Sequence, residues 1–101
     1  MIEQGDNMTV LKIRDIESAM RKKGFQYDPN GNKHKVLRFY HEGKMTTIKT
    51  HYSHSAKEIG DRLLEAMGEQ IYLTKNEFCE YVHCDISEKG YVDIIKARTE
   101  F

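Results

Sequence analysis

Two stretches of alternating side chains, separated by a short turn with a glycine, constrain the fold of this chain more than any other sequence feature. In residues 34–40, Leu37 and Phe39 alternate with polar, basic or smaller neighbours, and residues 45–51 continue the alternation. A period of two is typical of strands that bury one face and expose the other. The sequence therefore predicts a β-hairpin, with Leu37 and Phe39 facing the core.

The other face of the predicted hairpin carries basic and titratable side chains. On the first strand His34 and Arg38 fall opposite the apolar set, and on the second strand Ile48 marks the buried side, which places Lys49 and His51 outward. A histidine delivered to the start of a strand by a turn is a candidate acid/base group, because its unperturbed pKa lies near neutrality.

A helix and a short strand are predicted ahead of the hairpin. Apolar residues recur at spacings of three and four between positions 9 and 23, so this segment is expected to form an amphipathic helix that ends at Gly24. Residues 25–27 follow as a first strand. Residues 28–32, with the sequence Asp-Pro-Asn-Gly-Asn, form a dense turn signal that leads into the hairpin.

Helices are predicted for the rest of the chain. Ser55-Ala56-Lys57-Glu58 has the Ser-x-x-Glu form of a capping box, so a longer helix is expected to begin near Ser55. Thr74-Lys75-Asn76-Glu77 repeats that form, and Ser87-Glu88 precedes another apolar series. The apolar face of the longer helix consists of Ile59, Leu63, Leu64, Met67 and Ile71. Two short helices are expected to follow it.

These elements predict an α+β fold of order α-β-β-β-α, with a three-stranded antiparallel sheet, helices on one face and two short C-terminal helices. The expected organisation is a disordered tail over residues 1–8, a core over residues 9–73 and a C-terminal helical extension over residues 74–101 packed on the same domain. The extension is richer in apolar side chains than two short helices need alone, so a homodimer through these helices is also considered. Those side chains are Phe78, Tyr81, Val82, Tyr91, Ile94 and Ile95.

Charge is balanced overall but unevenly distributed. The formal net charge is zero, yet residues 32–57 hold six Lys or Arg against one acidic residue, and residues 58–101 hold five against ten. The basic block also contains four of the five histidines, namely His34, His41, His51 and His54. One half of the molecule is therefore expected to face a polyanion, more strongly at mildly acidic pH.

A cytoplasmic protein without a membrane span is expected. No apolar run approaches the roughly 20 residues of a transmembrane helix, and residues 1–7 lack the layout of a signal peptide. Cys79 and Cys84 lie five positions apart on a predicted helix, so their side chains diverge and a disulfide is not expected. Cys79 and His83 share a helical face, but two ligands do not make a zinc site, so no metal is expected.

Residues 13–73 resemble the HicA toxin family. The resemblance is carried by Gly31-Asn32-Lys33-His34, by the Lys-x-x-Arg-Phe strand that follows, by the polar return strand and by the flanking helices. It implies a fold like that of the double-stranded RNA-binding domain and an mRNA interferase activity with His34 as the catalytic residue. It also points to a HicA-like subgroup with a C-terminal helical extension, although this chain is neutral where the family is usually basic.

The resemblance implies RNA, single-stranded mRNA in particular, as substrate, an antitoxin protein as partner, and no cofactor. His34 would accept the ribose 2′-OH proton, while Arg38 and Lys49 on the same face would stabilise the charge on phosphorus. His51 and His54 are candidates for a second acid or for phosphate contacts, although such histidines are more often surface or capping residues. The full set of expected RNA or phosphate contacts is Lys33, Arg38, Lys49, His51, His54 and Lys57.

A second interpretation is a non-catalytic RNA-binding or protein-interaction module. Ser55-Ala56-Lys57 is similar to the end of the motif with which double-stranded RNA-binding domains place lysines near phosphates at a helix N-terminus. This interpretation keeps the fold and the basic face without cleavage.

Overall fold

The computed structural model describes residues 9–29 and 33–100. The tail predicted for residues 1–8 lies outside the described residues, as do Gly31 and Asn32 of the predicted histidine turn. The turn's last two residues, Lys33 and His34, are described, so the placement of the histidine can be assessed.

A three-stranded antiparallel sheet with strand order β2-β3-β4 forms one layer of the molecule. Its strands are β2 (Phe25–Tyr27), β3 (His34–His41) and β4 (Lys44–Ser53). Glu42 and Gly43 connect β3 to β4 with φ angles of 52° and 79°. Positive φ at both loop positions gives the twist that a two-residue hairpin needs. The predicted hairpin is confirmed, with a longer second strand than expected.

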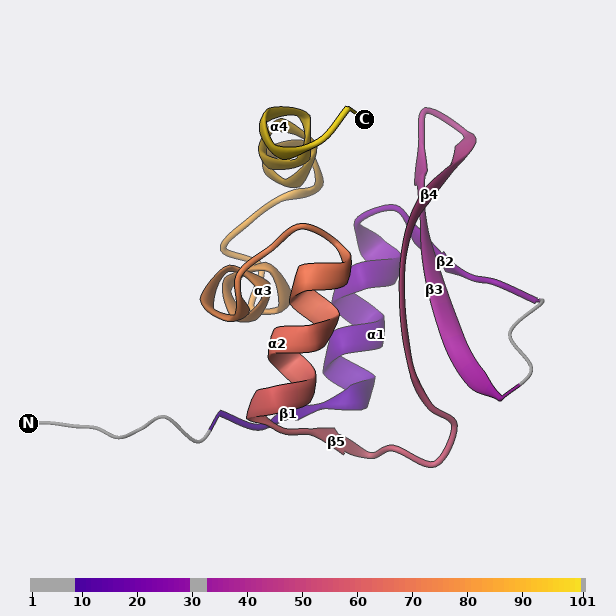
Figure 1. Cartoon of the computed structure of the whole chain (residues 1–101), viewed down its shortest axis with the longest axis vertical. Helices are drawn as coiled ribbons and strands as arrows, with labels where there is room; N and C mark the ends of the chain where they lie inside the picture. The colour runs from indigo at the N-terminus through magenta and orange to yellow at the C-terminus, as the bar shows by residue number, and fades with distance from the viewer. Residues whose placement is uncertain (1–8, 30–32, 101) are drawn as a thin grey trace, which may run out of the picture.

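The four helices lie on one side of this sheet (Figure 1). Leu37 and Phe39 are fully buried towards the helices, whereas Lys49 and His51 are exposed. The predicted division of the hairpin into a core face and an open face is confirmed. The α+β class and the antiparallel sheet are confirmed as well.

The first helix, α1 (Ile13–Lys22), is shorter at its start than predicted. Leu11–Lys12 instead forms the short strand β1, which pairs with β5 (Glu58–Ile59) in a separate two-stranded sheet. Neither strand was predicted, because two-residue strands are too short to show a period of two. At its other end α1 stops before Gly24, as expected; the φ of Gly24 is +103°, and a Cβ there would lie 2.8 Å from Phe39 Cε1.

The predicted capping box at Ser55 is wrong. The second long helix, α2 (Asp61–Gln70), follows Gly60 and has no side-chain cap. Lys57 accepts a hydrogen bond from the Ile13 N–H at 2.8 Å, and Ile59 is fully buried opposite Leu11. Pairing with β1 therefore takes up the backbone of the segment that was expected to be the first helical turn.

Two C-terminal helices complete the fold, as predicted. They are α3 (Lys75–Val82) and α4 (Glu88–Arg98), capped by Thr74 and Ser87. Thr74 and Glu77 form the expected reciprocal capping box. Every apolar side chain on which a homodimer was considered is buried within the chain except Ile94, which is half-buried.

Both cysteines are free thiols. Across residues 9–29 and 33–100, no helix combines the length and the apolar character needed to cross a bilayer.

Candidate functional site

His34 and His51 come together on the open face of the sheet. In the register of β3 and β4, His34 lies opposite Ser53 and His51 lies opposite Val36, so the two histidines are diagonal neighbours. Their ring centroids are 5.2 Å apart and the rings meet edge to face at 68°. Both side chains are exposed. The structure thus adds a second imidazole to the one that the sequence placed at the start of the strand.

The two imidazoles are among the residues that line a pocket of about 270 Å³ between β4, the segment after it, and α2. We call it the histidine pocket. Its polar lining residues besides the histidines are Tyr52, Ser53 and Gln70, and its apolar ones are Ala56, Ile59, Leu63, Ala66 and Met67. Titratable groups beside a small apolar concavity are the usual setting of a binding or catalytic site.

Two hydrogen bonds fix polar groups around this pocket. Thr50, which is fully buried on β4, places its hydroxyl 2.5 Å from Gln70 Oε1 at the end of α2. The Tyr52 hydroxyl donates a short hydrogen bond to Glu17 on α1. Burial, together with the Glu17 carboxylate, raises the pKa of Tyr52, so this phenol stays protonated. Tyr52 is therefore a structural tie and not an acid/base group.

Arg38 is held by other groups of the protein. Its guanidinium lies 3.1 Å from Asp28 Oδ2 through Nη2, and Nη1 donates to the Thr46 carbonyl at 2.9 Å. A second contact, from Nε, reaches the same Asp28 oxygen at 3.2 Å. Four positions of a strand also separate Arg38 from His34, which corresponds to about 13 Å. Arg38 thus ties β3 to the start of the turn, and its guanidinium is engaged by Asp28 and Thr46.

Lys49 is more accessible than the engaged Arg38 to a phosphate bound at the histidine pair. It is exposed opposite Arg38 and lies two residues from His51 on the same face of β4, a separation of about 7 Å. Lys33 is exposed directly before His34. These two lysines are the predicted cations that the fold leaves beside the histidine pair.

His54 and Lys57 are not among the residues that line the histidine pocket. His54 is exposed in the turn after β4. Lys57 lines a different concavity, with Lys12 and Arg14, next to the β1–β5 pairing. The helix N-terminus at which Lys57 was expected to contact phosphate begins four residues later, at Asp61. Neither residue therefore contributes to the histidine pocket.

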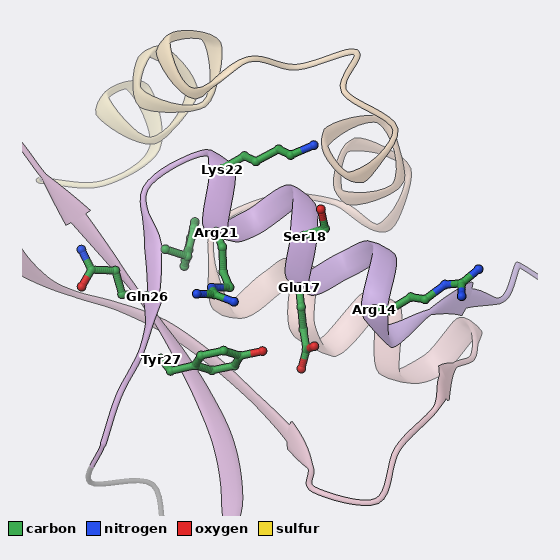
Figure 2. Close-up of a pocket in the computed structure, with 8 residues that line it drawn as sticks. Arg14, Glu17, Ser18, Arg21, Lys22, Gln26 and Tyr27 are labelled. Atoms are coloured by element: carbon green, nitrogen blue, oxygen red, sulfur yellow. The ribbon is translucent and has the colours of Figure 1, made fainter.

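Sequence reasoning missed a basic groove between α1 and the edge strand β2. The groove has a volume of about 710 Å³, and three cations line it, Arg14, Arg21 and Lys22. In Figure 2, Glu17 and Arg21 extend from α1 towards Tyr27 on β2. The Arg21 guanidinium carbon is 4.9 Å from the centre of the Tyr27 ring, a cation–π contact. The sequence shows the basic run Arg21-Lys22-Lys23 at the end of the predicted helix, but a helical period does not indicate which strand lies beside it.

No metal centre accompanies the histidine pair. Within residues 9–29 and 33–100, no group of three or more His, Cys, Asp or Glu side chains is arranged to hold an ion. Burial raises the pKa of the Cys79 thiol, which favours its protonated form over the thiolate that a metal needs.

Comparisons with family models, with curated proteins and with solved structures found no match to this chain. The functional assignment therefore depends on the residues and on the geometry described above.

Proposed function

We propose that the protein is a cytoplasmic, HicA-like endoribonuclease that cleaves single-stranded RNA without a metal, as the toxin of a toxin–antitoxin pair. The proposal includes the double-stranded-RNA-binding-like α-β-β-β-α fold, which the order of α1, β2, β3, β4 and α2 supports, with the short β5 between β4 and α2. The observation that supports it best is the His34–His51 pair on the open face, with 5.2 Å between ring centroids, beside the histidine pocket at the sheet edge.

Two imidazoles supply what RNA cleavage by the ribose 2′-OH requires. One neutral histidine accepts the 2′-OH proton while O2′ attacks phosphorus. The bond from phosphorus to the 5′ oxygen breaks, and the second, protonated histidine gives that oxygen a proton. The products are a 2′,3′-cyclic phosphate and a 5′-OH end. Histidine is the side chain that most often carries out such proton transfers in enzymes.

In this proposal His34 is the base, His51 is the acid, and Lys49 stabilises the charge that develops on the phosphate oxygens. Arg38 positions the strand and does not contact the phosphate, because Asp28 and Thr46 hold its guanidinium. The requirement for one neutral and one protonated histidine gives a bell-shaped dependence of the cleavage rate on pH.

The test compares wild type, His34→Ala, His51→Ala and His54→Ala on a long unstructured RNA in EDTA. We expect the first two variants to lose about 10²- to 10⁴-fold in rate, the usual contribution of a positioned acid or base. His54→Ala is the matched control, since it removes an exposed histidine that does not line the pocket. Mass spectrometry of the fragments reads the 2′,3′-cyclic phosphate ends. Cleavage by His34→Ala at the wild-type rate would contradict the proposal.

A second candidate function is RNA or protein binding without cleavage, and the basic groove between α1 and β2 favours it. Its three cations and its aromatic ring suit a polyanion as well as the open face does. Salt-sensitive RNA binding by wild type and by both histidine variants, with no cleavage by any of them, would support this second function over the first.

A further inference from the structure

The histidine pocket has the dimensions of a site for one small planar group. Its volume of about 270 Å³ lies just below the roughly 300–1,000 Å³ of pockets that take drug-sized ligands. A base pair or a helix of a partner protein is larger than this. The fold nevertheless leaves the space open at the surface, between the edge strand β4 and α2.

The chemistry of the pocket walls is apolar. Five of its lining residues are alanine, isoleucine, leucine or methionine, and the leucine, Leu63, is 58% exposed. More than half of this leucine side chain is therefore left uncovered by the rest of the protein. Its position at the pocket gives a bound aromatic ring an apolar surface to rest on, and this placement favours a ligand with flat apolar faces.

One polar group of the pocket is fixed in orientation. Because Thr50 holds Gln70 through its oxygen, at 2.5 Å, the amide nitrogen of Gln70 is left to donate to a ligand. The hydroxyl of Tyr52 is committed to Glu17. The pocket thus offers apolar walls and a directed donor, which match the faces and the accepting edge of a nucleobase.

We propose that the histidine pocket holds one unpaired nucleobase of an RNA strand, with Gln70 donating to its edge. For its ligand class this inference rests on the proposed function. The ribose links a base seated here to a 2′-OH and a 3′-phosphate at the pocket's edge, where His34 and His51 lie. A base within a duplex has both faces stacked and its pairing edge occupied, so only single-stranded RNA can fill the site.

The test measures binding of fluorescently labelled RNA in which every ribose is 2′-O-methylated, because this strand lacks the nucleophile and cannot be cleaved by the proposed route. Ala66→Phe places a ring in the pocket from an exposed position of α2, and Ala97→Phe makes the same change at an exposed position of α4. We expect Ala66→Phe to raise the Kd about 5- to 150-fold, the contribution of a stacked base, and Ala97→Phe to leave it unchanged. Leu63→Ser is a second pocket variant and should weaken binding in the same direction.

An abasic strand of the same length provides the control for the ligand. If the pocket holds a base, removing the bases weakens RNA binding by wild type far more than RNA binding by Ala66→Phe. The inference is overturned if wild type and Ala66→Phe bind the base-containing strand with equal affinity. It is also overturned if Ala66→Phe weakens binding of the abasic strand as much as it weakens binding of the base-containing strand. If binding depends on the bases but unmodified RNA stays intact after incubation, the nuclease proposal is wrong and the base-binding site is still supported.

Discussion

Among single residues, Lys23 shows how a charged group is accommodated in the interior. Its exposed fraction is 8%, and no salt bridge found among the described residues includes it. Its ammonium group donates to the Tyr81 carbonyl by a short hydrogen bond and to the Ile86 carbonyl at 2.8 Å, and it lies 4.5 Å from the centre of the Tyr81 ring. Carbonyls near the end of a helix carry partial negative charge, so the end of α3 compensates the lysine.

Replacing Lys23 by methionine is expected to destabilise the protein. The change keeps an unbranched apolar stem but removes the donor to the Ile86 carbonyl and one donor to the Tyr81 carbonyl, which still accepts from the Cys84 N–H. A buried carbonyl that loses its donor costs about 1–3 kcal/mol. Urea denaturation followed by circular dichroism measures the free energy of unfolding. Lys22→Met is the matched control, because Lys22 is exposed at the neighbouring position and should change stability by less than about 0.5 kcal/mol. Equal stability of the two variants would show that the buried ammonium group contributes nothing.

Among the elements, the contact between α3 and α4 depends on Glu77. The two nitrogens of Arg98 lie 2.6 and 2.7 Å from its two carboxylate oxygens, and Arg98 also donates to the Tyr72 carbonyl at 2.8 Å. Glu77 Oε1 in turn accepts from the Thr74 N–H at 2.8 Å. One carboxylate therefore caps α3 and ties the last turn of α4 to it.

These contacts predict a dependence of stability on pH. Arg98, followed by the Thr74 N–H, lowers the pKa of Glu77 from 4.5 to about 2. A group whose pKa is lower in the folded state contributes stability above its unfolded pKa, and this stability is lost as the pH falls from about 4.5 towards 2. At pH 7 the free energy of unfolding of wild type should exceed that of Glu77→Gln by about 0.5–1.5 kcal/mol, and this difference should shrink as the pH falls from about 4.5 towards 2.

Chemical denaturation at several pH values measures the difference, and Glu80→Gln, at an exposed position, is the control. A stability difference that does not change with pH would contradict the prediction.

The two capping boxes show which features of the fold could be predicted from the sequence. Thr74-x-x-Glu77 acts as predicted because its reciprocal hydrogen bonds join residues only three positions apart, so the local pattern contains them. Ser55-x-x-Glu58 fails because β1 and β5 pair at Lys12 and Glu58, and a pairing between segments so far apart leaves no local pattern. The hairpin and its faces were predictable because alternation is local.

The same distinction applies to the candidate site. Placing His34, Lys49 and His51 on one face required only the period of two. The pocket beside them could not be predicted, because α2 supplies four of its ten lining residues and the start of α2 was misplaced. The engagement of Arg38 by Asp28 likewise depends on how the chain returns from β2, which the sequence pattern does not specify.

For the whole molecule, a cluster of aromatic rings makes the C-terminal helices part of the core. Tyr91 of α4 lies with its ring centroid 5.8 Å from Phe25 and 5.2 Å from Phe39 of the sheet. Tyr81 of α3 lies 5.3 Å from Tyr91. Phe78 is packed near Gly68 of α2, where a Cβ would lie 3.3 Å from the Phe78 Cβ. The extension thus packs on the sheet, on α1 and on α2.

A fragment that ends at Leu73 is therefore expected not to fold. It lacks Phe78, Tyr81, Tyr91 and Ile95, all with zero exposure in the full chain. At about 1.5–3 kcal/mol for each buried side chain, their loss removes about 6–12 kcal/mol, which is comparable to the entire stability of a typical domain. Phe25 and Phe39 would also face water.

Thermal unfolding and the dispersion of the NMR chemical shifts of the fragment test this prediction. Tyr91→Phe in the full chain is the control, since it removes only the hydrogen bond to the Ile71 carbonyl. Cooperative unfolding of the fragment would mean that residues 9–73 fold independently of the C-terminal helices. If the fragment shows no cooperative unfolding, α2 keeps its position beside His34 and His51 only because α3 and α4 pack against it.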